Sequence, residues 1–456
     1  MRYVSTRGSA PILGFDDVVL TGLGTDGGLY VPEEWPSFDV AAVPPGSGYA
    51  AVATEYLRGF VGGSAVEHQL DDLVASTYRA FRHPDVAPLT EISPDRFLLE
   101  LFWGPTLSFK DYALQLVGGL FDRILEERGE SITVLGATSG DTGSAAIEAC
   151  RDRGSVDIAI LYPDGRVSEV QRRQMTTVLS DNVRAVAVDG TFDDCQDLVK
   201  STFADGDTRR RFRLAAVNSI NWARIVAQAA YYAYLGVRLG RPFSVAVPTG
   251  NFGNVFAAYV ARRTGVPISR LVVGNNANHG LADLIDSGRL PRGPVVPTIA
   301  PAMDIQIPSN LERLLFELFE RDGAATAAAV AEFRAGGVLT LDERRHERVR
   351  ATFEASWADD ATLARVMAEV HHEHGLVIDP HTAAGWHAAD RHPGADPMVV
   401  IATAHPVKFS EAVIAATGVE PRLPDDLADL LGRPERITRI PATAQAVAGV
   451  LEDFAA

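Results

Sequence analysis

Residues 243–254 read FSVAVPTGNFGN, an apolar run followed by a glycine-rich turn. Residues 243–247 predict a buried strand and residues 255–263 predict a helix, so the turn joins a strand to a helix start. Glycines let the backbone turn with its amides pointing inward, and the helix dipole attracts negative charge. The turn therefore predicts an anion cradle with phosphate as its guest; a glycine-rich connection without a ligand is the alternative. No Lys-Ser or Lys-Thr pair follows, so the turn is not a Walker A loop.

The same order of apolar run, polar turn and helix recurs through the middle of the chain. Further predicted strands lie at residues 132–136, 156–162, 183–188, 214–217, 271–273 and 398–403. The predicted helices lie at residues 143–153, 168–179, 193–203 and 222–235. This alternation is typical of parallel sheets with helices on both faces. The chain is therefore predicted to be α/β.

Two regions depart from this alternation. Residues 1–95 hold many Pro and Gly and few strand–helix units, which predicts an N-terminal cap domain. Residues from about 305 to 375 are mostly helical in pattern and rich in Ala, Glu and Arg. The second region predicts a helical insertion within the α/β pattern.

Composition narrows the classes of function. The formal net charge is −17, with 46% apolar and 22% charged residues, which is ordinary for a soluble enzyme and disfavours a nucleic-acid surface. No stretch approaches the roughly 20 apolar residues of a membrane span, and the N-terminus lacks the apolar run of a signal peptide. The two cysteines, Cys150 and Cys195, form no disulfide framework. A reducing, cytoplasmic location is expected.

Lysine is scarce in this chain. Only Lys110, Lys200 and Lys408 occur, so 39 of the 42 basic residues (42 minus 3) are arginine. Genomic base composition is a sufficient cause of the bias. Arginine cannot replace lysine where a neutral amine must form, because guanidinium does not deprotonate in proteins. Lys110 lies in FWGPTLSFKD at residues 102–111, where apolar neighbours would favour the neutral amine that a Schiff base needs. An ordinary surface lysine is the alternative.

Two more polar turns follow predicted strands. Residues 137–144 read ATSGDTGS, in which Ser139, Thr142 and the backbone amides could hold a carboxylate or phosphate. The alternative is a helix cap made by Asp141 or Thr142. Residues 218–224 read NSINWAR, with neutral donors and an Arg224 fork suited to phosphate. A capped helix with a solvated arginine is the alternative there.

Residues 402–409 read ATAHPVKF and follow the last predicted strand. The hydroxyl of Thr403 could face the same cleft as the other turns, because carboxyl ends of parallel strands are the expected place for a ligand. For His405 and Lys408 we expect a structural role or a place at the rim.

Two patterns are set aside. Residues 22–27 read GLGTDG, which matches G-x-G-x-x-G, but no helix pattern follows as a dinucleotide site requires. Residues 371–374 read HHEH, which we interpret as a solvated helix end and not as a metal site. No metal is therefore predicted.

Taken together, Lys110 and these segments make the chain resemble threonine synthases, pyridoxal-phosphate enzymes of the tryptophan-synthase-β type (fold type II). The likeness is to the longer subgroup of bacteria and fungi and covers nearly the whole chain. It is carried by YVSTRG at residues 3–8, DGGLYVP at residues 26–32 and PTLSFKD at residues 105–111. The implied architecture is two parallel-sheet α/β domains with the N-terminal cap and the helical insertion.

The resemblance implies site roles. Lys110 would bind pyridoxal 5′-phosphate as a Schiff base, and Thr403 would face the pyridine nitrogen. The cofactor phosphate would be held by the backbone of Gly250, Asn251, Phe252, Gly253 and Asn254. The substrate's carboxylate or phosphate would be held by Ser139, Asp141, Thr142, Asn218, Ser219 and Arg224. Relatives of this fold often have Asn near the cofactor's 3′-oxygen where this chain has Asp141, so we rank Asp141 below Ser139. Trp222 replaces a smaller residue or Pro and is expected to shape the substrate pocket.

The implied reaction converts O-phospho-L-homoserine and water to L-threonine and phosphate, a β,γ-elimination and replacement in threonine biosynthesis. A related pyridoxal-phosphate lyase or replacement enzyme acting on another amino acid is the main alternative. A non-catalytic phosphate-binding module is the alternative from another class.

The implied division places residues 1–95 in the cap and residues 96–110 with 225–456 in the large cofactor domain. Residues 111–224 would form a small mobile domain, because Lys110 and Arg224 bracket it. The longer subgroup is usually monomeric, so a monomer is expected.

Overall fold

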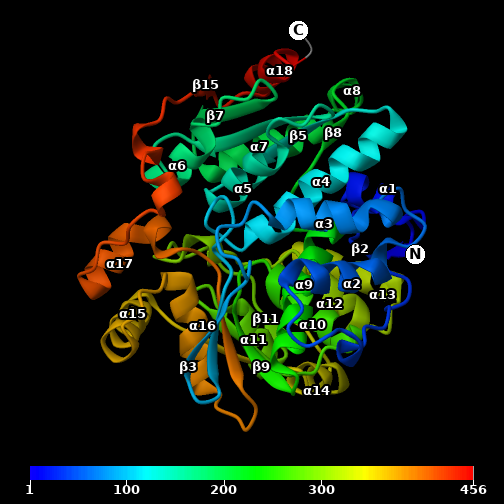
Figure 1. Ribbon diagram of the computed structural model, residues 1–456. Helices are drawn as coiled ribbons and strands as arrows, with labels where there is room; N and C mark the ends of the chain where they lie inside the picture. Colours follow the sequence, from blue (N-terminus) through cyan, green and yellow to red (C-terminus); the bar gives the residue numbers. More distant parts are fainter. Residues whose placement is uncertain (455–456) are drawn as a thin grey trace.

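The computed structural model describes residues 1–454, and two separate sheets dominate it (Figure 1). The large sheet has the order β13 (Phe353–Trp357), β10 (Ile268–Asn275), β9 (Phe243–Pro248), β14 (Met398–Ala402), β4 (Arg96–Glu100) and β3 (Leu89–Ser93). The small sheet has the order β15 (Thr438–Pro441), β7 (Val183–Asp189), β6 (Val156–Pro163), β5 (Ile132–Ala137) and β8 (Leu214–Ala215).

Neighbouring strands run parallel in both sheets except at one edge, where β3 is antiparallel to β4. The central strands β9 and β14 are buried at every position, as expected for parallel strands covered on both faces. The predicted α/β class with two parallel-sheet units is therefore confirmed.

Helices cover both sheets. Those beside the small sheet are α5 (Asp141–Cys150), α6 (Glu169–Thr176), α7 (Phe192–Ala204), α8 (Gly206–Arg211) and α18 (Ala444–Glu452). Those around the large sheet are α10 (Gly253–Thr264), α11 (Gly280–Ser287), α15 (Asp360–His374), α16 (Pro380–Arg391) and α17 (Ser410–Thr417). None of the helices within residues 1–454 is both long and apolar enough to cross a membrane.

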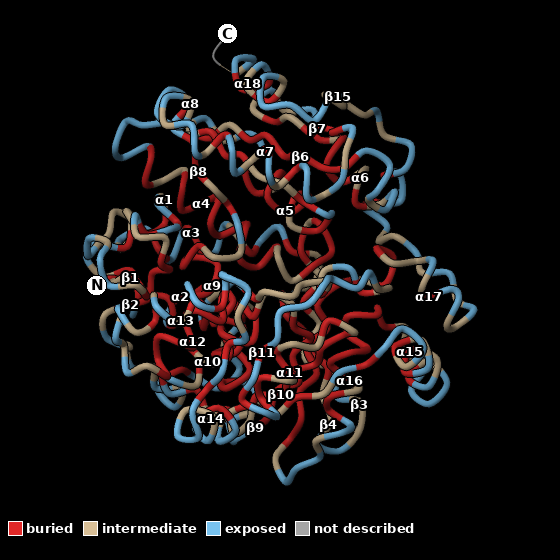
Figure 2. The backbone as a smooth tube through the Cα atoms, turned by 180° about the vertical axis from the view of Figure 1, so that it is seen from behind, coloured by how far each residue is buried: buried red, intermediate tan, exposed pale blue. Residues whose placement is uncertain are grey.

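Two long helices join the parts of the molecule. Helix α4 (Lys110–Arg128) packs on α5 and also on α9 (Trp222–Leu239). Residues 222–237 of α9 are all buried, because α2, α4 and α10 pack around this helix. Figure 2 shows this buried backbone near the centre of the molecule. Such a helix, apolar on nearly every face, belongs to a protein interior.

The N-terminal region packs onto the two long helices. It contains the antiparallel pair β1 (Tyr3–Ser5) and β2 (Tyr30–Pro32) with α1 (Phe15–Thr21), α2 (Tyr49–Val61) and α3 (Leu70–Tyr78). Its buried side chains share one hydrophobic core with α4 and α9. The G-x-G-x-x-G match at residues 22–27 forms a turn after α1, in which the Asp26 carboxylate accepts from Ser5 Oγ and the Gly28 amide. One strand departs from the predicted cap: β3 lies within residues 1–95 but belongs to the large sheet.

Two other strands also differ from the predicted division. The region at 305–375 is mostly helical, with α12 (Leu311–Leu318), α13 (Gly323–Arg334), α14 (Glu343–Arg350) and α15. It also holds β12 (Leu339–Thr340), which pairs with β11 (Arg289–Leu290) from before this region, and its β13 forms the edge of the large sheet. Near the C-terminus, β15 pairs with β7 of the small sheet and α18 packs on α7, whereas the prediction grouped residues 225–456 with the large sheet. Strands β13 and β15 both lie at sheet edges and are partly exposed, so their apolar pattern is weak.

Candidate active site

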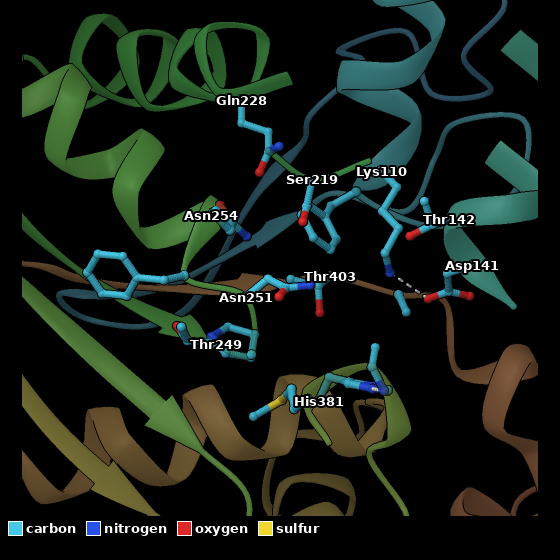
Figure 3. A pocket seen from close by; sticks show the side chains of 18 of the residues that line it. Lys110, Asp141, Thr142, Ser219, Gln228, Thr249, Asn251, Asn254, His381 and Thr403 are labelled. Carbon is cyan, nitrogen blue, oxygen red and sulfur yellow. Dashed lines mark hydrogen bonds and ion pairs between the residues drawn. The ribbon is translucent and has the colours of Figure 1, made fainter. Parts of the chain in front are cut away.

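A pocket with about 710 Å³ of space free of protein atoms, counted out to its mouth, lies at the carboxyl ends of β9 and β14. Lys110 at the start of α4 and Asp141 at the start of α5 face it from the other side (Figure 3). Its remaining lining comes from Phe109, Thr142, Ser219, Arg224, Gln228, Pro248, Thr249, Gly250, Asn251, Phe252, Gly253, Asn254, Ala302, Met303, His381, Thr403 and Ala404.

Lys110 is the first residue of α4 and is only 11% exposed. Its Nζ lies 3.0 Å from Asp141 Oδ2 and 5.0 Å from the centre of the Phe109 ring. The preceding segment is fixed by backbone bonds: the Phe109 amide donates to the Thr403 carbonyl at 2.8 Å, and Leu107 has a left-handed φ of 64°. Burial lowers the pKa of Lys110, with attraction to Asp141 opposing that shift. The amine is thus shifted towards the neutral form that Schiff-base chemistry requires.

Asp141 is the centre of a buried charge cluster. Its Oδ2 accepts from Lys110, and its Oδ1 accepts from Lys408 Nζ at 2.8 Å and Gln171 Nε2 at 2.8 Å. Burial pushes the pKa of Asp141 up, but the two lysines outweigh burial and hold that pKa below its usual value. Of the two expectations for Lys408, a structural role or a place at the rim, the rim position is wrong, because its side chain is 0% exposed. In the sequence, nothing but its place after β14 marks residue 408. In the fold, α6 and the segment before Lys110 cover it.

The glycine-rich turn joins β9 to α10, as the sequence predicts. Phe252 caps α10 with a left-handed φ of 61°, and its ring packs against Phe256 and Phe353, outside the pocket. Only the backbone of Phe252 is therefore suited to a ligand. Asn254 Oδ1 accepts from the hydroxyls of Tyr231 and Tyr232, which leaves its buried Nδ2 without a protein partner.

Gly250 lies close to the turn at residues 301–303. A Cβ at this position would come within 2.9 Å of the Ala302 carbonyl oxygen and 3.0 Å of the Met303 Cα. These two closest atoms belong to the backbone, which cannot rotate away as the nearby Ile305 side chain could. The near approach narrows the pocket around the turn.

Replacing Gly250 with alanine is expected to shift the turn and weaken cofactor binding by about tenfold, because small misplacements of a binding group are costly. Gly253→Ala is the matched control, since its Cβ would meet only side chains, those of Asn310 at 3.3 Å and Ile225 at 3.8 Å. Fluorescence titration with pyridoxal phosphate measures both affinities. Equal affinities in the two variants would show that the tight packing at Gly250 does not matter.

Arg224 is a buried cation on α9 with few partners. Its Nη1 donates to the Val217 carbonyl at 3.3 Å, its Nε has no partner, and no carboxylate of the described residues forms an ion pair with it. Burial lowers the pKa of Arg224 to about 10, so it stays charged at neutral pH. The neighbouring Gln228 also has a buried, unpartnered Oε1. Unpaired buried groups of this kind are costly unless a ligand completes them.

His381 is a lining residue that the sequence did not reveal. Its Nδ1 lies 2.7 Å from Asp379 Oδ2, and its Nε2 accepts from the Ala302 amide at 3.1 Å. Asp379 also caps α16, so the N-terminus of this helix anchors the 301–303 turn against Gly250. The pattern Asp-Pro-His-Thr at 379–382 signals a helix start but gives no sign of the pocket.

Most predicted site residues meet in this pocket, and two do not. Ser139 and Asn218 are exposed and are absent from the pocket wall, although Thr142 and Ser219 from the same turns line it. The preference for Ser139 over Asp141 as a lining group is therefore wrong. The lining residues to which sequence reasoning gave no role are Gln228, Pro248, Thr249, Ala302, Met303, His381 and Ala404, whereas Phe109 belongs to the apolar neighbours expected beside Lys110. Within residues 1–454, no group of three or more His, Cys, Asp or Glu side chains is placed to hold a metal ion.

The donors around the pocket fit a group that carries an aldehyde and a phosphate. Lys110 offers a buried amine, the unpartnered Asn254 Nδ2 offers a hydrogen-bond donor, and the α10 N-terminus offers backbone amides. Arg224 adds a second, uncompensated positive charge across the same pocket. The pocket therefore offers charge and hydrogen-bond donors to more than one anionic group.

Three family models match the chain. Residues 2–78 match "Threonine synthase N terminus", residues 96–335 match "Pyridoxal-phosphate dependent enzyme", and residues 382–451 match "Threonine synthase, C-terminal". The chain is 49% identical to threonine synthase of Pseudomonas aeruginosa, covering 97% of this chain and 96% of that protein. It is also 35% identical to threonine synthase-like 2 of Rattus norvegicus, covering 96% of this chain and 93% of that protein.

Solved structures agree in fold. The pyridoxal-phosphate-bound threonine synthase of Brucella melitensis superposes with a TM-score of 0.97 at 46% identity, covering 99% of this chain and 98% of that one. The yeast threonine synthase gives a TM-score of 0.93 at 34% identity, covering 100% and 99%. The resemblance read from residues 3–8, 26–32 and 105–111 is thereby confirmed. The chain belongs to the threonine synthase family of pyridoxal-phosphate-dependent enzymes.

Proposed function

We propose that this protein converts O-phospho-L-homoserine and water to L-threonine and phosphate. The observation that carries the proposal is a pocket in which the buried amine of Lys110 lies beside two separate anion-binding groups, the 250–254 turn and Arg224. A substrate with a phosphate of its own, acting together with a phosphorylated cofactor, needs both. The enzyme class is a lyase dependent on pyridoxal phosphate.

The roles of individual residues in cofactor binding are part of the proposal. The backbone of Gly250, Asn251, Phe252 and Gly253 with the Asn254 amide holds the cofactor phosphate, and Thr403 faces the pyridine nitrogen. The hydroxyl of Thr403 has no protein hydrogen-bond partner among the described residues and is 5% exposed, which suits that role. When bound, pyridoxal phosphate stabilises negative charge at the α-carbon of the substrate.

Lys110 acts as the general base. Its Nζ, once neutral, accepts the proton from the substrate α-carbon, and apolar burial beside Phe109 favours the neutral state. Later proton transfers at the β-carbon need a base within reach of the same atoms. Lys110 is the buried amine at the pocket that suits this role.

Substrate binding is assigned to Arg224, Ser219, Thr142 and Gln228. Arg224 supplies the charge for the substrate phosphate or carboxylate, because no protein carboxylate neutralises it. Ser219 and Thr142 belong to two turns that line the pocket, and each hydroxyl is an uncharged hydrogen-bond donor. Arg224 and Gln228 are buried, which keeps water away from them and strengthens their contacts with an anion. Asp141 is negatively charged and paired with two lysines, so it does not bind substrate anions. Its role is to contact Lys110 and influence the charge of that amine.

Domain closure remains a proposal. The small sheet and its helices carry Asp141 and Thr142, so movement of the predicted segment 111–224 would close the pocket on its ligand. The pairing of β15 with β7 means that residues 438–441 must move with that unit. Closure excludes water from the charged pocket.

A neutral hydroxyl at Thr403 is expected to favour elimination over other cofactor reactions, because it does not enforce protonation of the pyridine nitrogen. Thr403→Asp should therefore lower threonine output and raise the share of side products. Thr403→Ser, which keeps the hydroxyl, is the matched control. Chromatography of the reaction mixture gives both yields. Higher threonine output from the aspartate variant without side products would contradict this role.

A related pyridoxal-phosphate lyase is the second candidate, since a relative named threonine synthase-like 2 also matches 96% of this chain. Steady-state assays with O-phosphohomoserine, phosphothreonine and serine rank the candidates. The proposal expects equal release of threonine and phosphate from O-phosphohomoserine, with the highest kcat/KM of the three substrates. A higher value for either other substrate would replace the proposed function.

Location and assembly stay predictions. Cys150 and Cys195 are buried and unpaired, which suits a cytoplasmic location. A monomer without nucleic-acid partners is proposed from the resemblance and the charge of −17. Size-exclusion chromatography with light scattering gives the oligomeric state directly.

A further inference from the structure

Lys408 lies at the meeting point of three segments. It follows β14 in a short 3-10 turn at Pro406–Phe409. Its Nζ contacts Asp141 Oδ1 at 2.8 Å and donates to the Thr106 carbonyl at 2.7 Å. Asp141 begins α5 beside the small sheet, and Thr106 belongs to the segment that leads into Lys110. One ammonium group therefore bridges the large sheet, the small-sheet unit and the approach to Lys110.

The segment before Lys110 is also held from its other side. The Asp111 carboxylate accepts from the Thr106 amide at 2.8 Å and the Thr106 hydroxyl at 2.6 Å. The Thr106 carbonyl accepts from Gln174 Nε2 at 3.1 Å in addition to Lys408. This segment therefore has little freedom to move when the Lys110 amine changes its partner.

The charge balance around Asp141 depends on both lysines. An opposite charge within about 4–6 Å favours the charged form of a group, so a carboxylate next to one amine tends to keep that amine protonated. The reaction requires a neutral Lys110 amine, because only the neutral amine can bond to an aldehyde or accept a proton. A second cation on Asp141 removes this conflict. Lys408 is buried at 0% exposure, and its Nζ lies 2.8 Å from Asp141 Oδ1.

We propose that Lys408 is a positioning residue for this reaction: it is the permanent positive partner of Asp141, which lets Lys110 lose its proton without leaving a buried carboxylate uncompensated. The proposal rests on the proposed role of Lys110. Two of the chain's three lysines flank one carboxylate, in a protein that uses arginine at 39 other basic positions. A compact ammonium reaches the two acceptors in this buried space, and a guanidinium, although larger and planar, would keep the positive charge beside Asp141.

The groups that influence the proton on Lys110 come from several elements. Asp141 on α5 favours the ammonium form of Lys110. Arg224 on α9 and Lys408, which follows β14, disfavour that form. Asp111 lies next in sequence on α4, and His381 faces the same pocket from α16. Among these groups, Lys408 alone contacts Asp141 without itself lining the pocket.

The test measures the protonation of Lys110 without using the substrate. Full-length protein freed of cofactor is mixed with pyridoxal phosphate at a series of pH values. The neutral amine adds to the aldehyde carbon, the C=N bond forms, and water leaves; the ammonium proton goes to solvent. Borohydride then fixes the adduct, and mass spectrometry of the peptide that contains Lys110 gives the rate. The pH midpoint of this rate reports the apparent pKa of the amine.

Lys408→Met leaves Asp141 with Lys110 as its one cation. The midpoint should rise by about one pH unit, which lowers the capture rate near neutral pH by about tenfold. Lys408→Arg keeps the charge and should bring the midpoint back towards wild type. Lys200→Met is the matched control, because Lys200 is exposed and paired with Asp197 on the surface. An unchanged midpoint in folded Lys408→Met, or the same midpoint in Lys408→Arg and Lys408→Met, overturns the proposal.

The double variant Asp141→Asn/Lys408→Met covers the case in which the single variant does not fold, because it removes both members of the pair. Its midpoint should lie below wild type, since the contact with Asp141 outweighs the repulsion from Lys408; a midpoint above wild type overturns the proposal. If Lys408 acts through Asp141, Lys408→Met shifts the midpoint less in the Asp141→Asn background than in wild type. Equal shifts overturn that route. A wrong substrate would alter none of these readings, so failure of the proposed function is distinguishable.

Discussion

Replacing Lys110 with alanine should reduce kcat/KM for O-phosphohomoserine by at least about 10³-fold, within the range seen when a positioned proton-transfer group is lost. The variant should also lose the visible absorbance of the bound cofactor and the borohydride-fixed label on its peptide. Both effects follow because alanine can neither bond to the aldehyde nor accept a proton. Absorbance spectra, peptide mass spectrometry and steady-state assays measure the three quantities.

Lys200→Ala provides the comparison for this variant. Lys200 is 69% exposed and pairs only with Asp197 on the same helix, so its loss should leave activity and absorbance unchanged. Lys110→Ala should stay folded, since Asp141 keeps Lys408 and Gln171 as partners. Substantial threonine production by folded Lys110→Ala would remove the basis of the proposed mechanism.

Replacing Arg224 with methionine should have opposite effects on activity and stability. The variant loses the cation proposed for the substrate anion, and kcat/KM should fall by about 100-fold, as expected for a charged group whose binding partner is desolvated. The free energy of unfolding of the ligand-free protein should rise by about 1–3 kcal/mol, because a buried charge without a counter-ion is itself costly. Chemical denaturation and substrate titration measure these two changes.

Arg313→Met is the matched control for the stability effect. Arg313 is also fully buried, but its guanidinium donates to the Tyr30 carbonyl at 3.0 Å, to Asn310 Oδ1 and to the Ile220 carbonyl. Methionine there leaves these acceptors unpaired and should lower the free energy of unfolding by about 3 kcal/mol. If Arg224→Met destabilised the protein as much as Arg313→Met, Arg224 would be a structural residue and not a ligand-binding one.

The central strands were predictable because their signal is local. The predicted strands 132–136 and 183–188 agree closely with β5 and β7, and the predicted helix 193–203 agrees with α7. Helix α7 begins where the Thr191 hydroxyl and the Asp194 carboxylate cap each other's backbone amides, a feature written in adjacent residues. Strands β3, β13 and β15 were missed or misplaced, because an edge strand is partly exposed and its pairing partner decides its sheet.

The pocket was only partly predictable. Turns that follow buried strands of a parallel sheet meet at one edge, so the 250–254 turn, Asp141, Ser219 and Thr403 could be grouped in advance. Which side chain of a turn faces the cleft depends on backbone geometry. Gly140 has a φ of 141°, and the chain there buries Asp141 and leaves Ser139 exposed.

Apolar periodicity, turn residues and a lysine retained in an arginine-rich chain were enough for the α/β class and for Lys110 as a candidate, since each of these signals lies within a few neighbouring residues. The cofactor was implied by the resemblance to threonine synthases. Tertiary structure alone decided that His381 and Gln228 reach the same pocket from distant segments, and that Lys408 lies behind its wall, beside Asp141. It also decided that one carboxylate is shared by two lysines. The reason is physical: burial and charge compensation are properties of groups brought together in space, and no local pattern records them.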